Sequence, residues 1–211
     1  MTRGIHYLTN EMKELNVDLR LGKEACANCI MEENPDHVII AVGAYNIVPP
    51  IDGSKQPHVL DAWKVLNHEQ LPSGEVVVIG GGLVGAETAE LLAEMGCHVT
   101  IVEMLDEIAK EESSTVRPTM FETFGKHHVT LLTQTKVTQI NPTHIKAQKA
   151  DEEITIPCDY VVLAVGAKPQ TFDTAPLIEK GIDVHFIGDC HEKASDINHA
   201  IEEGYLIANS L

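Results

Sequence analysis

Val76-Val77-Val78-Ile79-Gly80-Gly81-Gly82-Leu83-Val84-Gly85 is the stretch that decides the fold of this chain. Its four β-branched residues are typical of a buried strand, and glycines follow them directly. The next segment carries one apolar helical face, formed by Val84, Thr88, Leu91, Leu92 and Met95 and ended by Gly96. Residues 99–102 are a second β-branched run. Strand, glycine turn, helix and strand make a βαβ unit, whose two strands lie parallel.

The glycine turn matches the pattern G-x-G-x-x-G of dinucleotide-binding folds. Gly80 permits the tight turn, Gly82 lets a pyrophosphate approach the backbone, and Gly85 lets the helix pack closely on the strand. The free N–H groups and the positive end of the helix dipole then face the phosphates. The sequence therefore predicts that Gly80, Gly81, Gly82, Leu83, Val84 and Gly85 bind a dinucleotide.

The acidic residue that such folds place about 20 residues beyond the glycines is Glu103 here. A carboxylate at this point hydrogen-bonds the adenosine ribose hydroxyls and repels a 2′-phosphate. The residues that follow, Met104, Leu105 and Asp106, offer no cation to such a phosphate. We therefore predict that the chain binds NADH in preference to NADPH.

Apolar periodicity and turn residues predict further elements outside the βαβ unit. Helices are expected at 5–15, 60–66, 114–126 and 197–211, and strands at 17–21, 37–43, 129–132, 136–140, 144–148, 153–157, 160–166 and 184–189. The strand at 160–166 runs into a glycine as the one at 37–43 does. This repetition suggests two similar nucleotide-binding folds.

The composition narrows the class of protein. With 15 Lys and Arg against 32 Asp and Glu, the formal net charge is −17, so a nucleic-acid backbone would be repelled. No apolar run approaches the ~18 residues of a membrane span, and the start shows no signal peptide. Five scattered cysteines indicate a reduced, cytoplasmic protein.

Taken together, these segments resemble the pyridine-nucleotide-disulfide oxidoreductase superfamily. The closest likeness is to the C-terminal FAD/NAD(P)-binding region of NADH:flavin oxidoreductases related to 2,4-dienoyl-CoA reductase, trimethylamine dehydrogenase and bacterial enoate reductases. The segments that carry the likeness are 4–8, 38–44, 78–89, 102–105, 162–166, 187–190 and 200–204.

The resemblance implies an α/β fold with two parts. The first is an NAD(H)-binding domain at 71–168, a Rossmann-like parallel sheet in which a three-stranded β-meander at 136–157 replaces a crossover helix. The second is an incomplete Rossmann-like FAD domain. It is built from residues 1–60 and from residues 183–211, where the chain comes back to this domain.

The resemblance also implies roles for single residues. Glu87 and Gly166 match positions near the nicotinamide, although Glu87 could be an ordinary exposed helix residue and Gly166 a plain turn glycine. Gly43 and Asp189 match positions that contact FAD. The hydride transfer needs no acid or base from the protein, so no catalytic residue and no metal ligand are expected.

Complete members of this family carry a FAD-binding βαβ segment and, further upstream, an FMN barrel with an iron–sulfur cluster. These absent parts and a small, unsaturated organic substrate are the expected partners. The chain alone is expected to be colourless and to self-associate through exposed apolar surface. The expected function is passage of hydride from NADH to FAD and onward to the substrate. The alternative is a non-catalytic NAD(H)-binding module that acts as a sensor or scaffold.

Two further features are expected to be structural. Cys26-Ala27-Asn28-Cys29 is a C-x-x-C sequence, but it lies where the family has an undistinguished polar connection. We expect neither cysteine to take part in turnover. Among 11 histidines only His127 and His128 are adjacent, and no spacing typical of a metal site is apparent.

Overall fold

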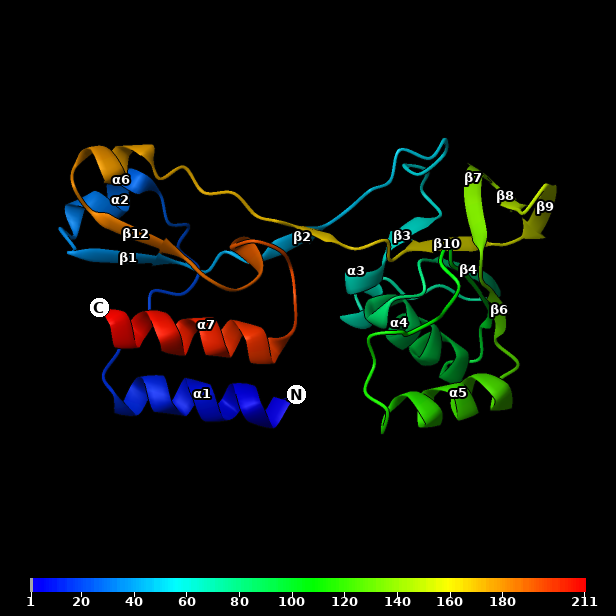
Figure 1. Ribbon diagram of the computed structural model, residues 1–211, viewed down its shortest axis with the longest axis horizontal. Coiled ribbons are helices and arrows are strands. Elements are labelled where there is room, and N and C mark those ends of the chain that lie inside the picture. Colours follow the sequence, from blue (N-terminus) through cyan, green and yellow to red (C-terminus); the bar gives the residue numbers. More distant parts are fainter. Residues whose placement is uncertain (1) are drawn as a thin grey trace. The chain divides into compact units, whose positions relative to one another are not determined.

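The computed structural model describes residues 2–211, which fall into two compact units. Unit 1 contains the residues up to Ile39 together with Phe172–His185, and unit 2 contains Ile40–Thr171 together with Phe186–Leu211. The chain therefore passes between the units three times. Figure 1 labels the elements of both.

The centre of unit 2 is a five-stranded sheet in which all neighbouring strands are parallel. Its order is β3 (Val59–Asp61), β10 (Tyr160–Leu163), β4 (Glu75–Ile79), β5 (His98–Val102) and β6 (Thr130–Leu132). The predicted α/β class with a parallel sheet is thus confirmed. β10 lies between β3 and β4, although it comes far later in the chain.

The apolar run of β4 is explained by burial on both faces of this sheet. Val76 and Val78 pack in a core with three helices, whereas Val77 and Ile79 pack in a second core with three antiparallel strands. The helices are α3 (Ala62–Leu66), α4 (Leu83–Glu94) and α5 (Arg117–Lys126). The strands are β7 (Thr135–Asn141), β8 (His144–Lys149) and β9 (Glu152–Pro157), which form the predicted meander.

The core of the parallel sheet also includes residues that precede the predicted range 71–168. Leu60, Ala62 and Val65, from β3 and α3, are buried in the same core as α4. The domain boundaries given by the sequence remain predictions. β3 and α3 lie before the range 71–168 that was predicted for the NAD(H)-binding domain.

Unit 2 also contains elements that the sequence did not predict. β2 (Ala44–Asn46) pairs antiparallel with β11 (Ala167–Pro169). A short 3₁₀ turn, η1 (Gly188–Cys190), precedes α7 (Ile197–Ser210), and Glu203 of α7 accepts a hydrogen bond from the backbone N–H of Gly188. Asp196 caps α7 by accepting from the N–H of His199 at 2.9 Å.

Unit 1 contains α1 (Thr2–Glu14), α2 (Ala27–Glu32) and α6 (Ala175–Glu179). It also contains β1 (His37–Ile40) and β12 (Asp183–Phe186) except for their last residues, and these two strands form a two-stranded sheet. The predicted strand at 17–21 is wrong. No strand of the described chain pairs with this segment, and Leu21 is 88% exposed, so the alternation of apolar residues there has no buried face.

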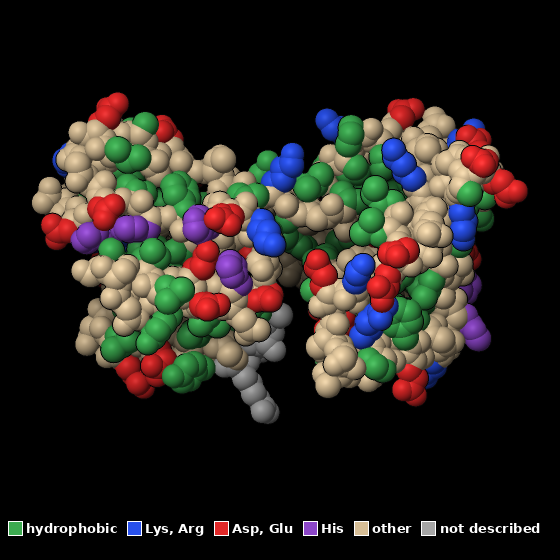
Figure 2. Space-filling view, viewed as in Figure 1, with side chains coloured by type: hydrophobic (Ala, Val, Ile, Leu, Met, Phe, Trp, Pro, Cys, Tyr) green, Lys and Arg blue, Asp and Glu red, His purple; other side chains and the backbone are tan. Residues whose placement is uncertain are grey.

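Exposed apolar side chains gather on two helices. On α1 they are Ile5, Tyr7, Leu8 and Met12, and on α7 they are Ile197, Ile201, Tyr205 and Leu206. Figure 2 shows apolar side chains of this kind in green. Within residues 2–211, no helix has both the length and the hydropathy that crossing a membrane requires. Self-association of the chain stays a prediction.

Candidate dinucleotide-binding site

The glycine turn after β4 is held in a conformation that side chains would disrupt at two of its positions. Gly80 has φ +103°, and a Cβ on it would overlap the carbonyl oxygen of Ala164. A Cβ on Gly85 would overlap the carbonyl oxygen of Gly80. The backbone of α4 therefore lies directly against the turn and the end of β10, and only glycine fits at these contacts.

Gly82 differs from these two glycines because nothing lies within 4 Å of the place where its Cβ would be. Its φ of −68° is open to any residue, so the backbone itself does not require glycine here. Gly82 is also the N-cap of the 12-residue helix α4, and no side chain of the described chain caps this end. The N–H groups of the first turn are thus available to an anion.

Glu103 connects the turn to the carboxyl end of β5. Its side chain is buried, and its two oxygens accept hydrogen bonds from the backbone N–H groups of Gly81 at 2.6 Å and Leu105 at 2.8 Å. Each carboxylate oxygen has two acceptor sites, so each can accept one further bond. Glu103, which is predicted to bind the ribose hydroxyls, therefore lies beside the turn that is predicted to bind the phosphates.

The loop that follows Glu103 packs over Gly81, which the sequence did not reveal. The N–H of Ala109 donates to the carbonyl oxygen of Gly81 at 2.7 Å, and a Cβ on Gly81 would overlap the side chain of Ile108. Arg117 donates to the carbonyl oxygen of Ile108 at 3.0 Å and pairs with Glu107 at 2.7 Å. The guanidinium that contacts this loop is therefore already neutralised by a carboxylate.

Glu87 and Gly166 lie in elements next to the turn. Glu87 lies on the exposed face of α4. Its pKa is raised, chiefly because its carboxylate loses part of its contact with water, and to a lesser extent because the carboxylates of Glu112 and Glu90 repel its negative charge. Gly166 follows β10 with φ +103°, and its carbonyl oxygen accepts from the N–H of Ile47 at 3.0 Å. Their roles near a nicotinamide stay predictions.

Gly43 and Asp189 are far apart in the sequence, but the fold brings them together at a second site. Both line a pocket of about 280 Å³ beside the N-terminus of α7, together with Ser195 and Ile197 among others. Asp189 accepts a hydrogen bond from the N–H of Ser195 at 2.9 Å, which holds its carboxylate in this pocket. Their contact with FAD remains a prediction. Because both residues line the same pocket, a single ligand bound there would contact both.

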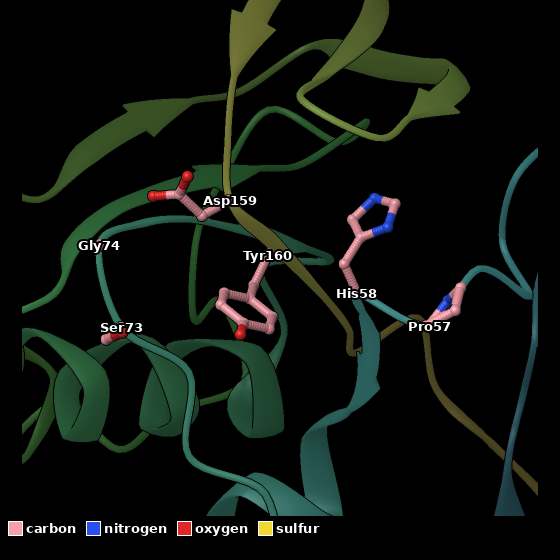
Figure 3. A pocket seen from close by; sticks show the side chains of 6 residues that line it. All are labelled: Pro57, His58, Ser73, Gly74, Asp159 and Tyr160. Carbon is pink, nitrogen blue, oxygen red and sulfur yellow. The ribbon is translucent and has the colours of Figure 1, made fainter.

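A larger pocket, of about 540 Å³, lies at the opposite end of the parallel sheet from the glycine turn. Figure 3 shows His58 and Tyr160 on its wall, with Ser73, Gly74 and Asp159 at the start of β4 and β10. Asp159 accepts from the N–H of Glu75 at 2.9 Å, so its carboxylate ties these two strands together. Ligands of open α/β sheets bind at the carboxyl ends of the strands, which argues against this pocket as the dinucleotide site.

The C-x-x-C sequence begins a short helix. Cys26 is exposed and is the N-cap of α2, where its sulfur accepts from the N–H of Cys29 at 3.3 Å. Hydrogen bonds from the side chain and the backbone of Cys29 lower the pKa of Cys26. Burial raises the pKa of Cys97 and raises that of Cys158 to about 11.

These pKa directions predict which cysteine reacts first. Since the thiolate is the nucleophile, Cys26 is expected to be alkylated by iodoacetamide at pH 7.5 well before Cys97 and Cys158. Peptide mapping by mass spectrometry at short times measures this order. Cys26→Ser should remove the fast phase, whereas Cys158→Ser should leave it unchanged. Faster labelling of Cys158 than of Cys26 would contradict the prediction.

Three comparisons relate the chain to known proteins. The family model for pyridine nucleotide-disulphide oxidoreductases matches residues 31–204. A bilirubin reductase of Mediterraneibacter gnavus is 66% identical over 211 residues, covering 100% of this chain, and an NADH oxidase of Thermoanaerobacter brockii is 38% identical over 208 residues, covering 96%. The structure of a 2-naphthoyl-CoA reductase in complex with 2-naphthoyl-CoA matches all of this chain with a TM-score of 0.88 and 28% identity.

The matched region is a minor part of each of these proteins. It makes up 33% of the bilirubin reductase, 32% of the NADH oxidase and 32% of the 2-naphthoyl-CoA reductase chain. The chain thus spans about a third of the length of the relatives it matches.

Proposed function

Because the chain belongs to the pyridine nucleotide-disulphide oxidoreductases, we propose that it is the NAD(H)-binding portion of a flavin-dependent oxidoreductase. The observation that carries this proposal is that a helix end at Gly82, which no side chain caps and beside which the space is open, lies next to the buried carboxylate of Glu103. The helix end would bind phosphate and Glu103 would bind the ribose hydroxyls. The two are linked by the hydrogen bond from the N–H of Gly81 to Glu103.

The residues of the turn fit NAD(H). The first-turn N–H groups of α4 would hold the pyrophosphate, and the open side of Gly82 would let it approach the backbone. Glu103 would accept hydrogen bonds from the ribose while the N–H groups of Gly81 and Leu105 hold its carboxylate in place. Glu87 and Gly166 would lie on the nicotinamide side of this site. No side chain of the chain is assigned a proton-transfer role, because the cofactors supply the redox chemistry.

In the whole protein, NADH would reduce FAD, and the electrons would pass on to an unsaturated organic substrate. Gly43 and Asp189 would contact FAD from one side, and the remaining FAD contacts would come from parts of the protein outside these 211 residues. FMN and an iron–sulfur cluster would belong to such parts as well. We propose that the chain belongs to the NADH:flavin oxidoreductase group related to 2,4-dienoyl-CoA reductase.

The names of two relatives support a proposal for the substrate class. One is named for bilirubin and another is seen with 2-naphthoyl-CoA, and both compounds are conjugated and unsaturated. We propose a conjugated organic molecule as the acceptor, with a linear tetrapyrrole such as bilirubin as the first compound to test. The whole protein should oxidise NADH when this acceptor is added and should contain flavin. A whole protein that binds NADH without any flavin would instead support a non-catalytic NAD(H)-binding module.

Nucleotide preference tests the site directly. NADH is expected to bind this chain more tightly than NADPH, because a 2′-phosphate would face the carboxylate of Glu103 and would leave its acceptor sites unmatched. The difference should be about 1–3 kcal/mol, the usual penalty for an unmatched buried polar group. Calorimetric titration with each nucleotide measures it, with AMP as a control for binding of the adenosine and its 5′-phosphate alone. Equal or reversed affinities would disprove the assignment of Glu103.

A further inference from the structure

Two histidines and an aspartate converge at the start of the small sheet of unit 1. His37 is the first residue of β1, Asp183 is the first residue of β12, and His185 lies two positions further along β12. The Nδ1 atom of His37 lies 3.3 Å from Oδ2 of Asp183, and Nε2 of His185 lies 3.1 Å from the same oxygen. Figure 2 shows histidine side chains (purple) against acidic ones (red) on this part of the surface.

The three groups have the spacing of ligands around one metal ion. Zinc binds imidazole nitrogen and carboxylate oxygen at about 2.0–2.2 Å, so two ligand atoms of a tetrahedral site lie about 3.4 Å apart. The two nitrogen–oxygen distances in this cluster are close to that value. The ligand atoms of all three residues lie within 4.8 Å of one another, so small side-chain rotations suffice to close the remaining gap. The two imidazole rings are also stacked, with centroids 6.0 Å apart.

The cluster is accessible and carries a mixed donor set. The side chain of His185 is 23% exposed, that of His37 is 41% and that of Asp183 is 58%, so an ion and its water ligands can reach all three. Two imidazoles with one carboxylate suit borderline divalent ions such as Zn²⁺ rather than Ca²⁺ or Mg²⁺, which prefer oxygen ligands. The chain's net charge of −17 also favours the approach of cations.

Two other groups of histidine and carboxylate side chains in the described residues are less suitable. His98 pairs with Glu75 at 2.7 Å, but this pair has one imidazole only. His191 and His199 both contact Glu203, whose other oxygen accepts from the N–H of Gly188 and so holds η1 against α7. Among the described residues, His37, Asp183 and His185 are the cluster whose ligand atoms all meet the spacing for one ion.

We propose that His37, Asp183 and His185 form a binding site for a divalent transition-metal ion of the Zn²⁺ class, with its remaining coordination positions open to water. The site connects β1 to β12, whose paired sheet has two strands. A bound ion therefore links these two strands and stabilises unit 1.

The first test uses the metal alone. The full chain, prepared without a histidine tag and stripped with a chelator, is titrated with Co²⁺ and followed by visible absorption, and Zn²⁺ is then added as competitor. One equivalent of Co²⁺ is expected to bind, to give a d–d band typical of nitrogen and oxygen ligands, and to be displaced by Zn²⁺. Zn²⁺ should also raise the temperature at which unit 1 unfolds.

Matched variants identify the ligands. His37→Gln and His185→Gln should each weaken Zn²⁺ binding by at least about tenfold, the lower end of what loss of even a supporting partner costs at a metal site. His98→Gln, which removes a histidine from a single-imidazole pair, should leave binding unchanged. The double variant Cys26→Ser/Cys29→Ser should also leave it unchanged, because the proposed ligands are not thiolates.

A further variant separates ligand loss from misfolding. Asp183→Asn keeps the size of the side chain, and circular dichroism together with the unfolding temperature of the metal-free chain checks that unit 1 remains folded. Weakened metal binding with an unchanged unfolding temperature of the metal-free chain supports the site. The proposal is overturned if Co²⁺ does not bind, if binding survives in His37→Gln and His185→Gln, or if it disappears with the two cysteines.

Discussion

Gly85→Ala is expected to remove measurable NADH binding and to destabilise unit 2. A methyl group on Gly85 would overlap the carbonyl oxygen of Gly80 and would also approach Ala164 at 3.3 Å. Both neighbours belong to the turn or to the strand beside it, so α4 would have to move away from the sheet. Overpacking of this kind costs about 1–3 kcal/mol of unfolding free energy. Urea unfolding measures that loss, and calorimetry measures the affinity for NADH.

Gly82→Ala is the matched control for this variant. Its added methyl group meets nothing within 4 Å, and the φ of −68° suits alanine, so the unfolding free energy should fall by less than about 1 kcal/mol. The methyl group would nevertheless lie where a pyrophosphate approaches the helix end. Gly82→Ala should therefore lose NADH affinity without losing stability, whereas Gly85→Ala should lose both. If Gly82→Ala binds NADH as the unmodified chain does, the turn does not hold the pyrophosphate.

Glu103→Ala is the second variant with a large expected effect. It removes the acceptor of two backbone N–H groups, those of Gly81 and Leu105, at a buried position. The contact with the N–H of Gly81 is buried, and a buried donor left without a partner costs about 1–3 kcal/mol, whereas the partly exposed N–H of Leu105 can bond to water. The variant should therefore be less stable, bind NADH more weakly, and show a smaller difference between NADH and NADPH. Thermal unfolding and titration with both nucleotides measure these three changes.

Glu103→Gln separates the structural role of this residue from its role in binding. An amide of the same length keeps one oxygen acceptor but presents N–H groups on the other side, where a backbone donor already lies. We expect an intermediate loss of stability and a narrowed nucleotide preference. Should Glu103→Ala and Glu103→Gln lose stability while the preference for NADH stays as it was, Glu103 would be a support for the turn and would not contact the ribose.

The parts of the fold that the sequence predicted well are those whose causes are local. The strand 76–79, the turn and α4 follow one another within 20 residues, and burial on both faces of the sheet produces the unbroken apolar run of β4. The glycines could be interpreted because their backbone requirements are specific to such a turn. The strand predicted at 17–21 had alternation alone, which does not supply a partner strand.

The parts that could not be predicted depend on contacts between distant segments. Nothing in the sequence near Gly81 indicates that Ile108 and Ala109 pack over it, because that contact depends on the path of the chain after β5. The pairing of β2 with β11 joins residues that are much further apart in the sequence. His37 and His185 lack any motif spacing in the sequence, and only the pairing of β1 with β12 brings them together.

The position of β10 has a consequence for the order of folding. As the chain leaves the ribosome, β3, β4, β5 and β6 are all made before β10, which must then enter between β3 and β4. Until residue 163 has been synthesised, one edge of the apolar strand β4 has no hydrogen-bonding neighbour, and such edges promote aggregation. Pairing across so long a separation is intrinsically slow. We therefore expect the insertion of β10 between β3 and β4 to be the folding step at which nascent unit 2 is most prone to aggregate.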